Sequence, residues 1–263
     1  MKEEKLDAIL RELDTAVVAF SGGVDSSYLA ARAWHVLGPK MVAVTADSES
    51  LAESQRAMAL DVARLVGFPH RFVRTTELSD PLYVKNAPDR CYHCKTELFR
   101  RLAALARAEG FAHLAYGAIV DDLADFRPGH RAAAEAGVRS PLAEAGMTKD
   151  DVREGSRAMG LPTSDLPASP CLSSRLPYGT PVSVAALKRV DQAEAAVRAL
   201  GFRELRVRHL GEVARVEVAP GELPRLADET LRIQVETAVR DAGYERVVID
   251  RTGYRRGRLN EEI

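Results

Sequence analysis

The heptad SGGVDSS, residues 21–27, limits the folds open to this chain more than any other stretch. It follows an apolar run at 15–20, which predicts a buried strand, and it opens an apolar, helix-compatible segment at 26–37. Adjacent glycines allow a tight bend and let backbone N–H groups approach an anion. The helix start adds N–H donors and the positive end of its dipole, and the serine hydroxyls add more donors. The stretch therefore predicts a strand, a phosphate-binding turn and a helix.

The heptad contains no lysine, so it is not a P-loop of the Walker type. SGG alone would indicate an ordinary polar turn, and the argument depends on the whole heptad in its strand–turn–helix setting. The heptad resembles the PP-loop of the ATP-pyrophosphatase superfamily, whose members split ATP between the α- and β-phosphates and adenylate a substrate. The resemblance implies that the departing pyrophosphate is held by Ser21, Gly22, Gly23, Val24, Asp25, Ser26 and Ser27.

Length and composition describe an ordinary globular protein. The chain has 263 residues, 46% apolar and 29% charged, which is enough for two domains. Its formal charge of −1 gives no bulk attraction to nucleic acid or to an anionic membrane. The sequence has no membrane-spanning run, and its charged start, MKEEKL, lacks a signal-peptide core. We therefore expect a cytoplasmic protein, in which three cysteines are reactive or metal-binding rather than disulfide-bonded.

Strands and helices alternate through the first part of the chain, which predicts an α/β fold with a doubly wound parallel sheet. A nucleotide would then lie beyond the carboxyl ends of the strands, near Ala46 and Ser48. The expected strands cover 15–20, 41–46, 70–74 and 113–117. The expected helices cover 3–13, 26–37, 50–66 and 95–109, with another from the capping-box residue Thr148 to about Met159.

The domain boundary is expected where prolines gather. Five prolines between residues 162 and 181 resist regular structure. The sequence thus predicts a domain at 1–165, a linker at 166–182 that carries Cys171, and a smaller α+β domain at 183–263. In that domain we expect helices at 183–200 and 229–242, a hairpin from 203–209 and 213–218 with its turn at Gly211-Glu212, and a strand at 246–250.

Cys91 and Cys94 form a CxxC pair, and Cys171 stands far away in sequence. A zinc site normally needs four ligands, and His93, inside the CxxC, is poorly placed to be the fourth. A thioredoxin-like redox pair needs a different neighbourhood. Three thiolates could instead hold three irons of a 4Fe-4S cluster and leave the fourth iron open.

Four motifs in order resemble the LarE family, the ATP-dependent sulfur transferases of nickel-pincer cofactor synthesis for lactate racemase. They are the heptad, RCYHCK at 90–95, DDLADFRPG at 121–129 and PCLSSRLPYG at 170–179. The resemblance implies a fold like that of the adenine nucleotide alpha hydrolases, ATP and Mg²⁺, and a homo-oligomer, a hexamer. It also implies the substrate, pyridinium-3,5-biscarboxylic acid mononucleotide, whose carboxylates are adenylated and then converted to thiocarboxylates.

The family has two sulfur routes, and Cys171 matches the sulfur-delivering position of both. In one route this cysteine gives up its own sulfur and becomes dehydroalanine. In the other, two further cysteines accompany it and a 4Fe-4S cluster passes on a sulfide. Because Cys91 and Cys94 are present, we favour the cluster route, with all three cysteines as ligands, and the sacrificial route stays open.

Further roles are implied by the same resemblance. Lys95 would be the base in C–S cleavage or would support a cluster-bound sulfide, and Asp25 would organise Mg²⁺ or the loop. Asp125 and Arg127 would shape the nucleotide or substrate pocket. A solvated charged face is the alternative for the residues implied in substrate binding, which are Arg175, Glu194, Arg206 and Arg208.

Other functions stay open at this point. An amidating PP-loop ligase would use ammonia and would not need Cys171. A transfer-RNA thiolase would usually have a basic surface, which the charge of −1 does not indicate. A non-catalytic nucleotide- or metal-binding module would bind ATP without forming AMP.

Overall fold

The computed structural model describes residues 1–123 and 128–255, and the chain forms two compact units. The first unit contains Met1–Asp80 and Asp89–Ser169. The second contains Pro81–Pro88 and the chain from Pro170 onward. Residues 81–88 therefore pack with the C-terminal part of the chain, an excursion that the sequence pattern did not indicate.

The first unit is built on a four-stranded, all-parallel sheet with the order β3-β2-β1-β4. The chain runs outward from β1 to β3 and then returns to the other side of β1. This places a topological switch point between β1 and β4, where ligands of open α/β sheets bind. The strands are β1 (Ala16–Ala19), β2 (Met41–Asp47), β3 (His70–Arg74) and β4 (His113–Tyr116).

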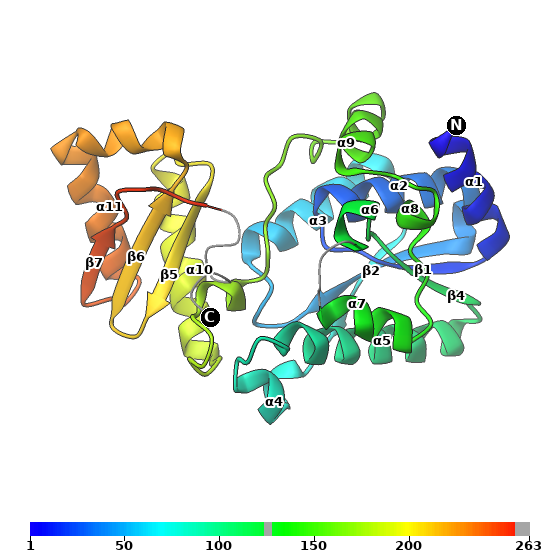
Figure 1. Ribbon diagram of the computed structural model, residues 1–263, viewed down its shortest axis with the longest axis horizontal. Helices are drawn as coiled ribbons and strands as arrows, with labels where there is room; N and C mark the ends of the chain where they lie inside the picture. The colour runs from blue at the N-terminus through cyan, green and yellow to red at the C-terminus, as the bar shows by residue number, and fades with distance from the viewer. Residues whose placement is uncertain (124–127, 256–263) are drawn as a thin grey trace. The chain divides into compact units, whose positions relative to one another are not determined.

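Helices cover both faces of this sheet, as expected for a doubly wound fold (Figure 1). One face packs against α1 (Lys2–Leu13), α2 (Val24–Leu37), α3 (Glu53–Val66), α8 (Pro141–Glu144) and α9 (Lys149–Ala158). The other face packs against α5 (Arg90–Glu109) and α7 (Pro128–Glu135). Shorter elements are η1 (Gly38–Lys40), η2 (Glu77–Ser79) and α6 (Val120–Leu123).

The structure confirms one expected helix start and corrects another. The capping box at Thr148 is confirmed, because the Thr148 N–H donates to Asp151 Oδ2 at 2.7 Å and the Asp151 N–H donates back to Thr148 Oγ1. The expected start of the next helix at Lys95 is wrong, because α5 already begins at Arg90. The CxxC pair therefore lies in the first turns of a helix and not in a connecting loop. Cysteine, tyrosine and histidine are not strong helix formers, so the sequence pattern predicted the start of this helix too far along the chain.

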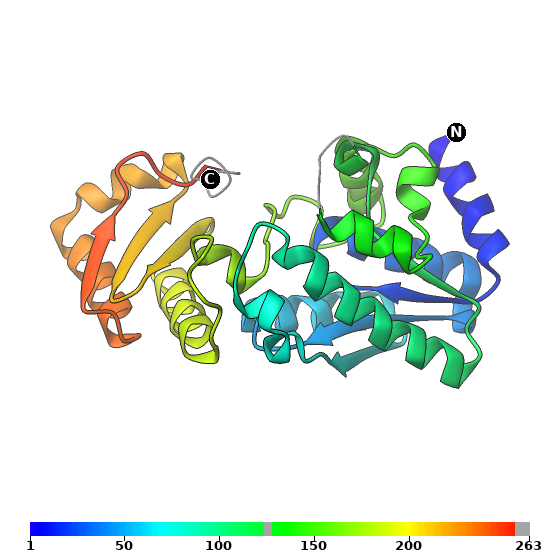
Figure 2. The same ribbon diagram turned by 60° about the horizontal axis from the view of Figure 1, so that its bottom comes forward.

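The second unit is a three-stranded mixed sheet with two helices on one face (Figure 2). β5 (Leu205–Leu210) pairs antiparallel with β6 (Val213–Val218), and β7 (Arg246–Ile249) pairs parallel with β6. The hairpin turn is confirmed, with Gly211 at φ 67°. The two helices are α10 (Val184–Ala199), capped by Ser183 as expected, and α11 (Glu229–Asp241). The unit also contains α4 (Pro81–Val84), η3 (Leu172–Arg175) and η4 (Pro220–Ala227).

Within residues 1–123 and 128–255, no helix combines the length and the apolar character that crossing a bilayer requires.

Candidate functional site

The heptad forms a tight turn at the carboxyl end of β1. Gly22 has φ 72°, a left-handed conformation that favours glycine, and a Cβ there would lie 3.0 Å from the backbone nitrogen of Ala59. Gly23 is the N-cap of α2, which begins at Val24, two residues before the expected start. The second half of the heptad is therefore the first turn of α2. The leading N–H groups of a helix have no acceptor in a preceding turn, whereas the Ser27 N–H donates to the Gly23 carbonyl at 2.9 Å.

Serine hydroxyls form hydrogen bonds within this turn. Ser26 Oγ donates to the Gly23 carbonyl at 3.1 Å and accepts from the Ser21 N–H at 3.2 Å, and the two serine Oγ atoms lie 3.0 Å apart. The Ser27 Oγ is fully buried and has no hydrogen-bond partner among residues 1–123 and 128–255. An orphaned buried hydroxyl beside free N–H donors fits an anionic ligand such as pyrophosphate.

Asp25 is held by an ion pair and not by a helix cap. Lys149 Nζ donates to both carboxylate oxygens, at 2.7 and 2.5 Å, and the Lys149 N–H donates to Asp121 Oδ2 at 2.7 Å. Burial raises the pKa of Asp25, and the hydrogen bonds and charge of Lys149 oppose that rise. The pair ties the start of α2 to the start of α9.

Gly117 places the end of β4 against the turn. A Cβ on Gly117 would lie 2.9 Å from the Ser26 nitrogen and 3.0 Å from the Asp25 carbonyl carbon. These are backbone atoms and cannot swing aside as the end of a flexible side chain can. The strands on both sides of the switch point thus meet at the anion-binding turn, which is where the topology predicts a ligand.

The end of β2 lies at the same edge of the sheet, because β2 pairs with β1 in parallel. Ala46 is half-buried, Asp47 forms an ion pair with Arg56, and Ser48 is buried with its Oγ accepting from the Ser50 N–H at 3.2 Å. The structure therefore brings Ala46 and Ser48 to the sheet edge that carries the heptad.

The CxxC pair lies on α5. Cys91 is exposed and Cys94 is half-buried, and a spacing of three places both on one side of the helix. The Lys95 Nζ lies 5.8 Å from the ring centroid of Phe99. In the part of the chain that the structure describes, no group of three or more His, Cys, Asp or Glu side chains is arranged to hold a metal ion. Since Cys171 belongs to the other unit, ligation by all three cysteines stays a prediction.

Cys171 stands at the head of η3, a single 3₁₀ turn, and is half-buried. Its carbonyl accepts three hydrogen bonds: from the Ser174 N–H at 3.0 Å, from Ser174 Oγ at 2.8 Å and from Arg175 Nη1 at 2.9 Å. Arg175 Nη1 also donates to the Pro170 carbonyl at 2.5 Å. The backbone around the thiol is therefore fixed from both sides of Cys171. We call residues 170–182 the sulfur loop.

Arg175 is anchored in turn by a buried carboxylate. Its Nε and Nη2 donate to the two oxygens of Glu194 at 2.8 and 2.9 Å, and the exposed fractions of the two side chains are 1% and 0%. Glu194 also accepts from Arg198 at 2.8 Å and from the Val207 N–H at 3.1 Å. Burial alone would raise the pKa of Glu194, but the charges of Arg175, Arg198 and Arg206 and the Arg175 hydrogen bonds lower it to about 2.

A second arginine reaches the sulfur loop from β5. Arg208 pairs with Glu217 at 3.0 and 2.9 Å and donates to the Ser174 carbonyl at 3.0 Å. Arg206 lies two positions away on the same strand face, buried, with its guanidinium 4.7 Å from the Tyr254 ring centroid. Burial lowers the pKa of Arg206. The sequence-predicted set is thus brought together around the loop, and Glu217 joins it as a residue that sequence reasoning missed.

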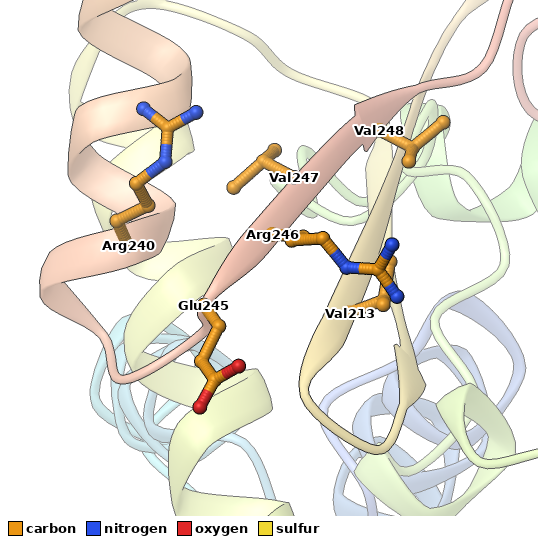
Figure 3. A pocket seen from close by; sticks show the side chains of 6 residues that line it. All are labelled: Val213, Arg240, Glu245, Arg246, Val247 and Val248. Carbon is orange, nitrogen blue, oxygen red and sulfur yellow. The ribbon is translucent and has the colours of Figure 1, made fainter.

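Two hollows lie away from these residues, one in each unit. A shallow hollow of about 260 Å³ flanks β7, with Arg246 on one side of the strand and Val247 facing α11 on the other (Figure 3). A hollow of about 300 Å³ in the first unit is lined by His93 and by residues of η2 and α5. Neither hollow is lined by the heptad or by the sulfur loop. Asp125 and Arg127 lie outside the described residues, so their expected roles stay predictions.

Fold and site together define a two-unit α/β protein with an anion-binding turn in one unit and an arginine-anchored thiol in the other. No family model matches the chain. It is 42% identical over 262 residues to an uncharacterised protein of Synechocystis sp., covering 100% of this chain and 98% of that protein. It is 24% identical over 239 residues to an uncharacterised protein of Methanocaldococcus jannaschii, covering 91% and 90% of the two chains.

A third relative has a named function. The chain is 35% identical over 264 residues to the pyridinium-3,5-bisthiocarboxylic acid mononucleotide synthase of Lactiplantibacillus plantarum, covering 100% of this chain and 95% of that enzyme. The chain therefore belongs to the LarE family.

Proposed function

We propose that this protein is an ATP-dependent sulfur transferase that makes pyridinium-3,5-bisthiocarboxylic acid mononucleotide for the nickel-pincer cofactor. The full-length identity of 35% to the synthase carries the proposal. The anion-binding turn and the anchored Cys171 loop support it, because they supply the two parts that such a reaction needs.

The first step activates a carboxylate. A substrate carboxylate oxygen attacks the α-phosphorus of ATP, and pyrophosphate leaves. The N–H groups at the start of α2, with the Ser27 hydroxyl, stabilise the charge that builds up on the leaving group. Mg²⁺ would neutralise further phosphate charge, and Asp25, in the first turn of α2, would help to organise it. The product is an acyl adenylate, whose carbonyl carbon is open to a nucleophile.

The second step installs sulfur. A sulfur nucleophile attacks the acyl carbon and AMP leaves. In the sacrificial route the nucleophile is the Cys171 thiolate, and removal of its α-proton then breaks the Cβ–S bond, which leaves a thiocarboxylate and dehydroalanine. Lys95 would be the base in that step. In the cluster route, which we favour, Cys91, Cys94 and Cys171 would hold a 4Fe-4S cluster, which would supply the sulfide nucleophile.

The arginines support substrate anions. Arg206 and Arg208 share a strand face and would attract the phosphate of the mononucleotide. Arg175 and Glu194 are buried and hold the loop, so a direct contact of Arg175 with substrate would have to replace a bond that it already makes. We also propose a cytoplasmic homo-oligomer, a hexamer, as the family resemblance implies.

The experiment is a reaction of the protein with ATP, Mg²⁺ and pyridinium-3,5-biscarboxylic acid mononucleotide under anaerobic conditions. We expect AMP, pyrophosphate and substrate in which oxygen is replaced by sulfur, by mass spectrometry. Cys171→Ser should retain pyrophosphate formation and lose sulfur transfer, because the adenylate forms without the thiol but AMP leaves only when sulfur attacks. Cys91→Ser should lose iron and transfer in the cluster route and retain transfer in the sacrificial one. Absence of sulfur incorporation with or without a rebuilt cluster would reject the proposal.

A further inference from the structure

The segment 81–88 is far from Cys171 in sequence but forms hydrogen bonds with the sulfur loop. We call this segment the strap. It belongs to the second unit, although the chain on both sides of it belongs to the first. Its last residue, Pro88, is followed three positions later by Cys91. No sequence motif or family expectation gave the strap a role.

The strap binds the sulfur loop at both ends. Tyr83, 1% exposed, has its hydroxyl 2.6 Å from Ser173 Oγ, two residues from Cys171. Asn86 is fully buried, and its Nδ2 donates to the carbonyls of Pro177 and Thr180 at 2.8 Å each. Backbone bonds add to this: the Gly179 N–H donates to the Asn86 carbonyl at 3.0 Å.

These hydrogen bonds take the place of the backbone hydrogen bonds that a regular strand or helix would supply to the loop. Pro170, Pro177 and Pro181 have no N–H, and the single 3₁₀ turn η3 is the regular structure that the loop forms. Asn86 itself has φ 56°, a left-handed conformation that asparagine tolerates better than most residues. The side-chain amide of Asn86, a residue whose backbone conformation is costly, therefore satisfies two half-buried carbonyls of the loop.

We propose that Tyr83 and Asn86 are positioning residues for sulfur transfer, because they fix the loop that carries Cys171. This inference rests on the proposed function. Arg175 and Arg208 hold the loop from the side of the small sheet, and the strap holds its start at Ser173 and its end at Thr180. A nucleophile held in one geometry reacts faster than one on a mobile loop.

The test uses substitutions that keep the local backbone. Asn86→Asp keeps size and tolerance of positive φ but removes the N–H donors, and Asn86→Gly removes the side chain without strain. Tyr83→Phe removes one hydroxyl. We expect transfer to slow roughly tenfold to hundredfold in the Asn86 variants, with the KM for ATP unchanged. Maleimide labelling of the Cys171 peptide, followed by mass spectrometry, should become severalfold faster because the loop opens.

Two controls separate positioning from stability. Asp228→Ala removes the N-cap of α11, whose Oδ1 accepts from the Leu231 N–H at 3.0 Å, and so weakens the same unit away from the loop. Combining Tyr83→Phe with Ser173→Ala should change labelling no more than either substitution alone, because both remove the same contact.

The outcomes are distinct. Wild-type transfer and labelling rates in the Asn86 variants would overturn the inference, and so would equal slowing by Asp228→Ala at a matched melting temperature. If the wild-type protein formed no thiocarboxylate, the proposed function would be wrong, and the labelling rates would still decide whether the strap fixes the thiol.

Discussion

Replacing Glu194 by glutamine should destabilise the second unit much more than the loss of a glutamate on a solvated charged face would. Glutamine keeps the shape of the side chain, but the buried guanidinium of Arg175 loses its counter-charge. The pKa of Glu194 falls from 4.5 to about 2, which corresponds to about 3 kcal/mol of folding free energy at neutral pH. Removing one partner of a buried ion pair costs a similar amount, about 3–5 kcal/mol.

This contribution has a defined pH window. A carboxylate with a lowered pKa stabilises the folded state above its unfolded value, and the stabilisation is lost as the pH falls from about 4.5 toward 2. The difference in stability between the wild-type protein and Glu194→Gln should therefore be largest near neutrality and should shrink below pH 4.5.

Hydrogen exchange with mass spectrometry is the suitable assay, because a chain with two units need not unfold in one step. Peptides from α10 and β5 report the opening free energy around Glu194. Arg198→Gln is the matched control: Arg198 pairs with the same carboxylate but is 27% exposed, so about 1 kcal/mol or less is expected. A loss below about 1 kcal/mol in Glu194→Gln, or a difference that grows in acid, would refute the reasoning.

Three further substitutions test other parts of the structure. Gly117→Ala should abolish or strongly weaken ATP binding measured by calorimetry while circular dichroism stays unchanged, because its Cβ would lie 2.9 Å from the Ser26 nitrogen; normal binding would contradict the assigned close approach. Gly155→Ala should cost about 1–3 kcal/mol in thermal unfolding, because a Cβ there meets the Tyr28 ring at 2.5 Å, and an unchanged melting temperature would show that the ring moves freely. Asp228→Ala should cost about 1 kcal/mol by loss of a helix cap, seen as faster exchange in α11 alone, and uniform exchange changes would argue against a local effect.

Local patterns predicted most elements of this fold. The strands at 70–74 and 213–218 match β3 and β6 in both bounds, and the caps at Thr148 and Ser183 were confirmed. Such features depend on neighbours in the sequence, where apolar spacing and a capping side chain are visible. The helix α7, Pro128–Glu135, was missed because its alanines and glycine carry little pattern.

The candidate site was only partly open to such reasoning. Spacing on a strand correctly placed Arg206 and Arg208 on one face, since a period of two needs no tertiary information. The roles of Lys149, Gly117 and Glu217 could not be found, because each depends on a partner far away in the chain. The sequence pattern placed Gly117 at the end of the strand expected at 113–117 and gave no sign of its close approach to Ser26.

Cys171 shows why a thiol motif alone underdetermines chemistry. Its motif names the residue, but what fixes the backbone at the thiol is one carbonyl that accepts from Ser174 and Arg175, and a carboxylate at Glu194 that keeps Arg175 in place. That carboxylate stays charged because three arginine charges oppose its burial. The charge of Glu194 therefore acts on the sulfur loop through Arg175, which donates to the Cys171 carbonyl. Loss of that charge should alter the reactivity of the Cys171 thiol without any direct contact between the two side chains.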